Sequence, residues 1–308
     1  MKKIISILYF TAVFTFLSFT QSAYNSNLLS TTAFNVSEIN DIFINVTFEE
    51  IEFSEIYGSE IVIDIYGNNN LLLPKITNDK ENGSLNISSS EKWKNATAGD
   101  ICKIAVYIPA ESFFNSFSIE FTNKQIINIG NIAANNINIL DKTPPANSSN
   151  IFIQNVKGNL KAVSTTGNIN IKNYKGEYFS AVTKTGNISC SNITADYFDL
   201  KSNTGHISIA LDNFPSGSSL ISSKTGNVQF FIPTNSYIKA VQEDKADSDN
   251  NGTNTGFNLN IHSTNGTFFN KLENKRFSPR QGYEESFNGG GAVISIETVT
   301  GNIEVDEY

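Results

Sequence analysis

The sequence predicts an all-β protein built as a β-solenoid, that is, a single-stranded parallel β-helix. The composition is rich in Asn, Ser, Thr and Ile and has only 17% charged residues, which suits strands and tight turns. A Thr-Gly signature followed by alternating apolar residues recurs between residues 165 and 230, as TTGNINI, KTGNISC, NTGHISI and KTGNVQF. Its spacing of about 19 residues is typical of one solenoid coil, and we expect the coils to be right-handed.

The chain begins with a segment typical of export. Its first residues contain two lysines, then an apolar run from Ile4 to about Phe19, then small and polar residues, in the sequence MKKIISILYFTAVFTFLSFTQSAYN. This is the layout of a secretory signal peptide, which we assign to residues 1–23 with cleavage near Ser22 or Ala23. An uncleaved membrane anchor is the alternative, for which the apolar run is somewhat short. We expect an exported chain with no stable membrane insertion after cleavage.

The charge argues against a nucleic-acid partner. Loss of Lys2 and Lys3 takes the formal charge from −8 to −10, which leaves no basic surface to neutralise phosphates. Only Cys102 and Cys190 are present, too few for a disulfide scaffold. Each cysteine should lie on the same face of its strand as neighbouring apolar residues, so two buried thiols are favoured over a disulfide.

Residues 24–125 lack the Thr-Gly signature but keep the alternation of a strand. EIVIDIYG (60–67) and CKIAVYIP (102–109) are expected strands, the second ended by Pro109. We expect this region to pair with the first coils and cap them, because an open solenoid end exposes unpaired backbone. A separate globular domain is the alternative.

The coils themselves are expected over residues 126–308. After each signature glycine, alternate residues are apolar and should face inward together, as Ile169 and Ile171 do in the first copy. Glycine and asparagine tolerate the backbone of a sharp corner, and stacked corner residues can hydrogen-bond along the solenoid. The signature glycines should therefore form one column and have a structural role; they are Gly167, Gly186, Gly205 and Gly226.

The pattern extends beyond these copies in both directions. Residues 126–140 predict one or two strands, NIFIQNVKGNLKAVSTTG (150–167) predicts another coil, and ISIETVTGNIEV (294–305) predicts the final coil. Two polar, turn-rich stretches at about 242–256 and 270–291 lack the period and are expected to be loops that project from the stack. Such loops are natural recognition sites.

The repeated signature, together with a strand region that ends in VYIP (106–109), resembles the bacterial putative-adhesin family of exported domains of unknown function. The resemblance covers about residues 35–308. It implies a β-solenoid at the cell envelope and supplies no catalytic residues.

No cluster of reactive residues stands out. Asp196, Asp199 and Asp212 fall at different coil positions and are best interpreted as solvated acids. His206 occupies a corner where other coils have Asn, and His262 shares no metal-ligand spacing with it. Asp247, Asp249 and Asn251 have the spacing of a calcium loop, but position twelve is Asn258 where Glu is expected, so a flexible acidic loop is favoured. We therefore assign no catalytic, cofactor-binding or metal-binding residue.

These observations favour an exported, non-enzymatic, adhesin-like protein that presents a polar face or its loops to an envelope, matrix or glycan ligand. A periplasmic structural or envelope-stress-associated protein is the alternative. A carbohydrate-active enzyme on a β-helix is a third, weaker hypothesis. The sequence does not determine the oligomeric state.

Overall fold

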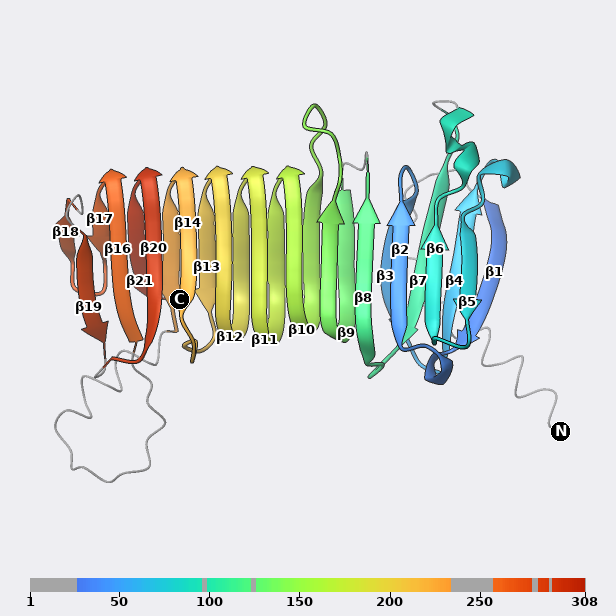
Figure 1. The fold of residues 1–308 in the computed structure, drawn as a ribbon, viewed down its shortest axis with the longest axis horizontal. Helices are drawn as coiled ribbons and strands as arrows, with labels where there is room; N and C mark the ends of the chain where they lie inside the picture. The colour runs from blue at the N-terminus through green and yellow to red at the C-terminus, as the bar shows by residue number, and fades with distance from the viewer. Residues whose placement is uncertain are drawn as a thin grey trace, which may run out of the picture.

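The computed structural model describes residues 27–95, 99–122, 126–233, 257–278, 282–287 and 290–307. Within these ranges the protein consists of strands and three 3₁₀ helices, Val36–Glu38, Asn70–Leu72 and Glu91–Asn95. No described helix is long and apolar enough to cross a membrane. Figure 1 shows the strands stacked side by side along the long axis. The chain is thus all-β, with a long array of parallel strands, as the repeat predicts.

The regular coils are long strands that bend once. They are β9 (Ile126–Asp141), β10 (Asn150–Thr166), β11 (Ile169–Thr185) and β12 (Ile188–Thr204), each parallel to the next. Each bends at an asparagine in the left-handed region, such as Asn173 with φ 56°. We call the part before this asparagine the first limb and the part from it to the next glycine corner the second limb.

Later coils are split into shorter strands. They are β13 (Ile207–Leu211), β14 (Ser219–Thr225), β15 (Val228–Ile232), β16 (Phe257–Asn265), β17 (Phe268–Asn270), β20 (Ala292–Thr300) and β21 (Ile303–Glu307). First limbs pair in the order β12, β13, β15, β21 and β17, and second limbs in the order β12, β14, β20 and β16.

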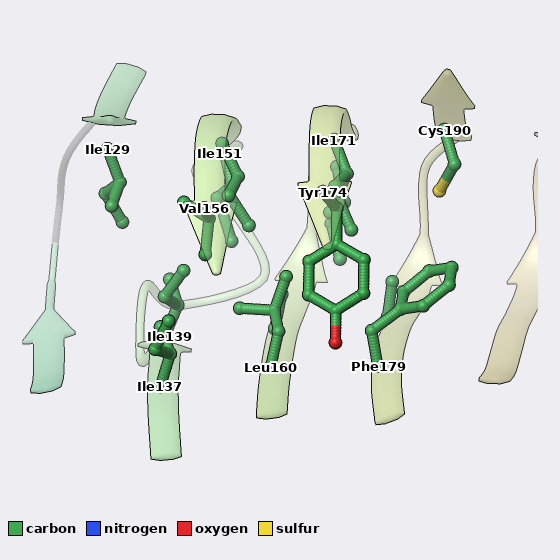
Figure 2. Packing of buried hydrophobic residues seen from close by; sticks show 14 of the residues in the cluster. Ile129, Ile137, Ile139, Ile151, Val156, Leu160, Ile171, Tyr174, Phe179 and Cys190 are labelled. Atoms are coloured by element: carbon green, nitrogen blue, oxygen red, sulfur yellow. The ribbon is translucent and has the colours of Figure 1, made fainter. Parts of the chain in front are cut away.

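The apolar residues that follow each glycine corner form a continuous inward column. Ile169 is opposite Ile188, which is opposite Ile207. Every member of the column is almost inaccessible to solvent, and Figure 2 shows how side chains from successive coils point into one interior. Burial of each such side chain contributes about 1.5–3 kcal/mol. The column consists of Ile127, Ile151, Ile169, Ile188, Ile207, Val228, Ile303 and Phe268.

The glycine corners form the predicted column, and the backbone requires glycine there. Gly205 has φ 153°, and a Cβ atom on it would lie 1.9 Å from the carbonyl oxygen of Gly186. Gly301 has φ 157°, and its Cβ would lie 2.0 Å from the carbonyl oxygen of Gly226. Any side chain would therefore force adjacent coils apart.

A buried hydroxyl three residues before the glycine supports five of the corners, those at Gly186, Gly205, Gly226, Gly266 and Gly301. Ser202 Oγ donates to the carbonyl of Gly186 at 2.9 Å, and Ser223 Oγ donates to that of Gly205 at 2.8 Å. Thr183, Thr298 and Ser263 make the equivalent bond to the neighbouring coil. These hydroxyls explain why a polar side chain is tolerated in the interior.

The C-terminal coil lies in a position that the sequence did not predict. β20 pairs with β14 on one side and β16 on the other, and β21 lies between β15 and β17 in the same way. The segment expected to be the final coil is therefore the last in sequence but the second to last in space. The glycine corners and the inward apolar positions recur in the inserted coil, so it pairs in parallel register with neighbours that are distant in sequence.

The stretch at about 270–291 is also different from the expected projecting loop. It contains β18 (Lys275–Phe277) and β19 (Tyr283–Phe287), which pair antiparallel with β17 and β16. These two strands cover the backbone edges of the outermost coil, which would otherwise be unpaired. The stretch at 242–256 lies outside the described residues.

The N-terminal strands continue both limbs of the solenoid as two facing rows. They are β1 (Asn27–Asn35), β2 (Asp41–Val46), β3 (Glu50–Ile56), β4 (Glu60–Gly67), β5 (Lys75–Asp79), β6 (Ser84–Ser88), β7 (Cys102–Pro109) and β8 (Phe114–Phe121). The strands expected at 60–67 and 102–109 are β4 and β7.

One row has the order β3, β7, β4, β1, and the other has the order β8, β2, β6, β5. β8 pairs in parallel with the second limb of β9, through residues 134–141. Phe53 of β3 packs edge-on against Phe117 of β8 at 5.5 Å between ring centres, which joins the two rows across the interior.

Candidate binding face

The outward surface of the second limbs carries two stacked tyrosines. Tyr178 of β11 and Tyr197 of β12 are paired in register, and their ring centres lie 4.8 Å apart with 29° between the ring planes. Tyr197 is 37% exposed, and Tyr178 is half-buried. The two rings thus form an aromatic surface that faces solvent.

The backbone of Tyr178 is held from both sides. Its N–H donates to Asn159 Oδ1 of the preceding coil at 3.2 Å. Its carbonyl oxygen lies 2.6 Å from the hydroxyl of Tyr174, which also lies 2.7 Å from the carbonyl oxygen of Gly158. Figure 2 shows the Tyr174 ring inside the stack, beside Leu160 and Phe179. Burial raises the pKa of the Tyr174 hydroxyl, with smaller contributions from nearby acidic groups, so it remains a neutral donor.

Polar and charged groups surround the tyrosines on the same surface. Lys161 of β10 is exposed, and it shares a row across the strands with Ser180 and Asp199. Asp199 Oδ2 accepts a 2.7 Å ion-paired bond from Lys201 Nζ. We call this surface the tyrosine patch; it consists of Asn159, Lys161, Tyr178, Tyr197, Asp199 and Lys201.

The three aspartates considered in the sequence have separate surroundings. Asp199 is paired with Lys201, Asp196 Oδ1 accepts a 3.1 Å bond from Ser216 Oγ, and Asp212 is exposed. In the described part of the chain, no three His, Cys, Asp or Glu side chains lie close enough to hold a metal ion. The calcium-loop residues Asp247, Asp249 and Asn251 lie outside the described residues.

His206 takes the place of a corner asparagine, as its position in the repeat predicts. Asn187 Oδ1 accepts the backbone N–H of His206 at 2.8 Å, and His206 Nδ1 accepts that of Asn227 at 2.9 Å. Asn227 Oδ1 then accepts the N–H of Asn302 at 2.9 Å. Because Nδ1 acts as an acceptor, the imidazole proton lies on Nε2. This corner ladder links the regular coils to the inserted C-terminal coil. His262 is an exposed residue on β16, in register with Glu297.

A second ladder runs along the opposite corner. The side-chain amides of Asn155, Asn173 and Asn192 each donate to the asparagine of the preceding coil, at 3.0, 2.8 and 2.8 Å. All three have φ near 55°. These asparagines therefore have a structural role.

Cys102 and Cys190 are both buried as thiols, and no disulfide joins them. Cys190 belongs to an inward column between Ile171 and Ile209. Burial raises the pKa of the Cys190 thiol, so it is a packing residue of low reactivity.

The tyrosine patch was missed by the sequence analysis. Its signal is present, because Tyr178 and Tyr197 occupy the same position of two consecutive coils, in EYF and DYF. The alternation assigns both to the outward face, but an outward aromatic residue is common on a strand, and only the ring geometry shows that the two stack.

Comparisons with known proteins identify the family of the chain. No curated protein matches it. It is similar to the crystal structure of a putative adhesin from Bacteroides fragilis, with 13% identity, 91% of this chain and 96% of the other covered, and a TM-score of 0.45.

It is also similar to a putative adhesin from Parabacteroides distasonis, with 10% identity, coverages of 92% and 98% and a TM-score of 0.36. A putative cell adhesion protein from Clostridium sporogenes has 8% identity, coverages of 92% and 100% and a TM-score of 0.26. The family model described as Toastrack DUF4097 matches residues 39–306, almost the whole described chain. The resemblance to the bacterial putative-adhesin family is confirmed, and the chain belongs to the Toastrack DUF4097 family.

Proposed function

We propose that this protein is an exported, non-enzymatic, adhesin-like binding protein that presents the tyrosine patch to a glycan at the envelope or outside the cell. The observation that carries the proposal is the stacked pair Tyr178 and Tyr197, in which the backbone of Tyr178 is held by Tyr174 and Asn159. A preorganised site binds more tightly because less conformational freedom is lost on binding.

The chemistry of the patch suits a sugar. A sugar ring has an apolar face and hydroxyl groups at its edge, and tyrosine offers an apolar ring with a polar hydroxyl at its tip. Lys161 and Lys201 supply donors, and Asp199 supplies acceptors, for the hydroxyl groups at the ring edge. The patch combines an aromatic surface with polar groups of both kinds, which matches the two kinds of surface on a sugar.

We also propose that the chain has three parts. Residues 1–23 are a signal peptide that is removed, residues 24–125 cap the stack, and residues 126–308 form a right-handed solenoid of about 19 residues per coil. The registers of β10 to β12 support the coil length, because paired positions such as Ile169 and Ile188 are 19 residues apart. The parallel pairing of β8 with β9 supports the capping role.

Glycan binding tests the proposal directly. The mature chain, residues 24–308, is applied to an array of bacterial and host glycans, and binding to each hit is then measured by calorimetry for Tyr178→Ala and Tyr197→Ala. Each variant should weaken binding by about fivefold to 150-fold, because loss of an aromatic contact at the centre of a site costs about 1–3 kcal/mol.

The matched control is Phe152→Ala. Phe152 is 41% exposed on the first limb of β10 and lies outside the patch, so its loss should leave glycan affinity unchanged. An array without hits, or equal losses for Phe152→Ala and Tyr197→Ala, would refute the proposal. Release of new reducing ends from a glycan would show an enzyme instead.

The alternative, a periplasmic structural protein, differs from the proposed binding protein in where the protein is located in the cell. Protease treatment of intact cells should digest the protein if it is exposed at the surface and should leave it intact if it remains in the periplasm.

A further inference from the structure

The two rows of strands end together at the N-terminal end of the stack. Counted from β9, one row contains β3, β7, β4 and β1, and the other contains β8, β2, β6 and β5. Each row therefore has four strands. The last strand of the first row is β1 and the last strand of the second is β5, and Figure 1 shows both at the end near the N-terminus. Among the described residues, β1 pairs only with β4 and β5 only with β6. Each strand presents one backbone edge without a described strand partner.

The β1 edge lacks the features that normally prevent strand pairing. Residues 27–35 contain no charged residue and no proline, and such an edge is a template for another strand. The bulge between Leu28 and Ser30 disturbs only its first part. From Ser30 to Asn35 the pairing with β4 is regular.

The β5 edge is complementary to its own antiparallel copy. β5 has the sequence KITND. When two copies pair antiparallel about Thr77, Lys75 of each lies opposite Asp79 of the other. Opposite charges in directly opposed positions stabilise a strand pair. In β1, a pairing centred on Thr32 places Ser30 opposite Phe34 on the inner face and Thr31 opposite Ala33 on the outer face.

One symmetry operation makes both contacts. A two-fold axis perpendicular to the strand rows that passes beside both Thr32 and Thr77 brings β1 beside its copy and β5 beside its copy, and it makes both pairs antiparallel. On the inner face, Phe34 and Ile76, half-buried at the end of the core, would be covered by Ser30 and Asn78 of the other chain. Such a contact is isologous and closed.

The opposite end of the stack disfavours the same arrangement. Self-pairing of β18 about Arg276 would place arginine opposite arginine, and self-pairing of β19 about Glu285 would place glutamate opposite glutamate. Like charges directly opposed are destabilising. In these registers the two ends are therefore different, since like charges are opposed at the C-terminal end and unlike charges at β5.

We propose that two copies of this chain associate end to end through β1 and β5, as a two-fold dimer with one continuous interior. The proposal concerns self-association alone and is independent of the glycan ligand. The dimer would carry two tyrosine patches, one on each arm.

Charge reversal at β5 tests the pairing. The mature wild-type chain should have twice the monomer mass in sedimentation equilibrium at about 50 µM. Lys75→Asp and Asp79→Lys, each alone, should raise the dimer dissociation constant at least about tenfold, because like charges then meet at both positions. A one-to-one mixture of the two variants should again form dimers, since the aspartate introduced at position 75 of one chain then meets the lysine introduced at position 79 of the other in one contact, and the native pair of Asp79 with Lys75 forms in the second contact.

The control is Lys80→Asp, which changes the net charge by the same amount. Lys80 lies in the next turn, 74% exposed, with an ion pair to Glu38, and this variant should remain dimeric. Circular dichroism checks folding, because Asp79 also accepts hydrogen bonds from the backbone of Glu81 and Asn82.

A cysteine at the two-fold axis provides a second test that needs no change of charge. In Thr77→Cys, the two introduced thiols face each other with Cβ atoms about 4.5–5.5 Å apart, close enough for a disulfide after small adjustments. Mild oxidation should cross-link this variant at least about tenfold faster than Thr185→Cys, an exposed control in the middle of the stack.

A wild-type chain that remains monomeric to about 100 µM would overturn the proposal. A dimer that is unaffected by Lys75→Asp, or that cross-links no faster at position 77 than at position 185, would also overturn it and would place the contact elsewhere. Recovery of a different protein on this edge, with no self-association, would show that the edge serves another strand donor.

Discussion

The regular coils β10 to β12 and the C-terminal coils differ in how chain order relates to spatial order. In β10 to β12, each coil pairs with the one that precedes it in sequence. In the C-terminal part, β20 and β21 enter between coils that were both completed earlier in the sequence. Yet both regions have the same corners, because Gly301 lies against Gly226 as Gly205 lies against Gly186. The corner residues thus specify contact between layers, and they do so without reference to chain order.

Removal of residues 292–308 should have the largest effect. Without β20 and β21, β16 and β17 lose their only parallel partners among the described residues, together with Ile294, Ile296 and Ile303 of the shared core. At about 1.5–3 kcal/mol for each buried side chain, this loss exceeds the stability of a local unit. Hydrogen exchange should show residues 257–277 unprotected, with β10 to β12 still protected. Retained protection at 257–277 would contradict the inserted order.

Substitution of a corner glycine should have the next largest effect on stability. Gly205→Ala and Gly301→Ala should each lower the free energy of unfolding by roughly 3–5 kcal/mol, because the Cβ meets a backbone oxygen and the backbone is strained. Urea denaturation measures the change. Gly99→Ala is the control, since a Cβ there meets nothing within 4 Å. A small effect at Gly301 with a large effect at Gly205 would show that the inserted coil is held less closely than the regular ones.

The buried hydroxyls should contribute less. Ser202→Ala and Thr298→Ala should each cost about 1–2 kcal/mol, because a hydrogen bond to the neighbouring coil is lost inside the stack. Ser189→Ala, on the exposed face of the same strand β12, should change the melting temperature very little. Equal effects at Ser189 and Ser202 would argue against a role for the inward hydroxyl.

The corner ladder allows the finest comparison. His206→Asn should change the free energy of unfolding by less than about 0.5 kcal/mol, since Asn accepts the same N–H in other coils. His206→Ala should cost about 1 kcal/mol, because the N–H of Asn227 loses its acceptor. Thermal melts of both variants measure the difference. A large cost for His206→Asn would mean that the imidazole has a role that Asn cannot fill.

The sequence predicts the elements that depend on local chemistry. The glycine corners, the inward alternation and the strands at 60–67 and 102–109 follow from backbone conformation and side-chain parity, which a short stretch of residues determines. His206 as a substitute for asparagine follows from its position in the repeat.

The sequence does not predict features that depend on which strands become neighbours. TVTGNIEV contains the same signature as the other coils, so nothing in it indicates that it enters between two earlier layers. The strands β18 and β19 are three and five residues long and occur in a stretch rich in polar and turn residues. The tyrosine patch requires the register between two coils, which fixes the distance between the rings.

The inserted coil has a consequence for how the protein is made. A ribosome delivers the chain from its N-terminus, so the stack can grow layer by layer up to Ile232. The next layer to be delivered, β16 and β17, meets its native neighbours β20 and β21 only after the last residues of the chain have emerged. The native order of the final two layers therefore depends on the last coil of the protein, which completes the fold.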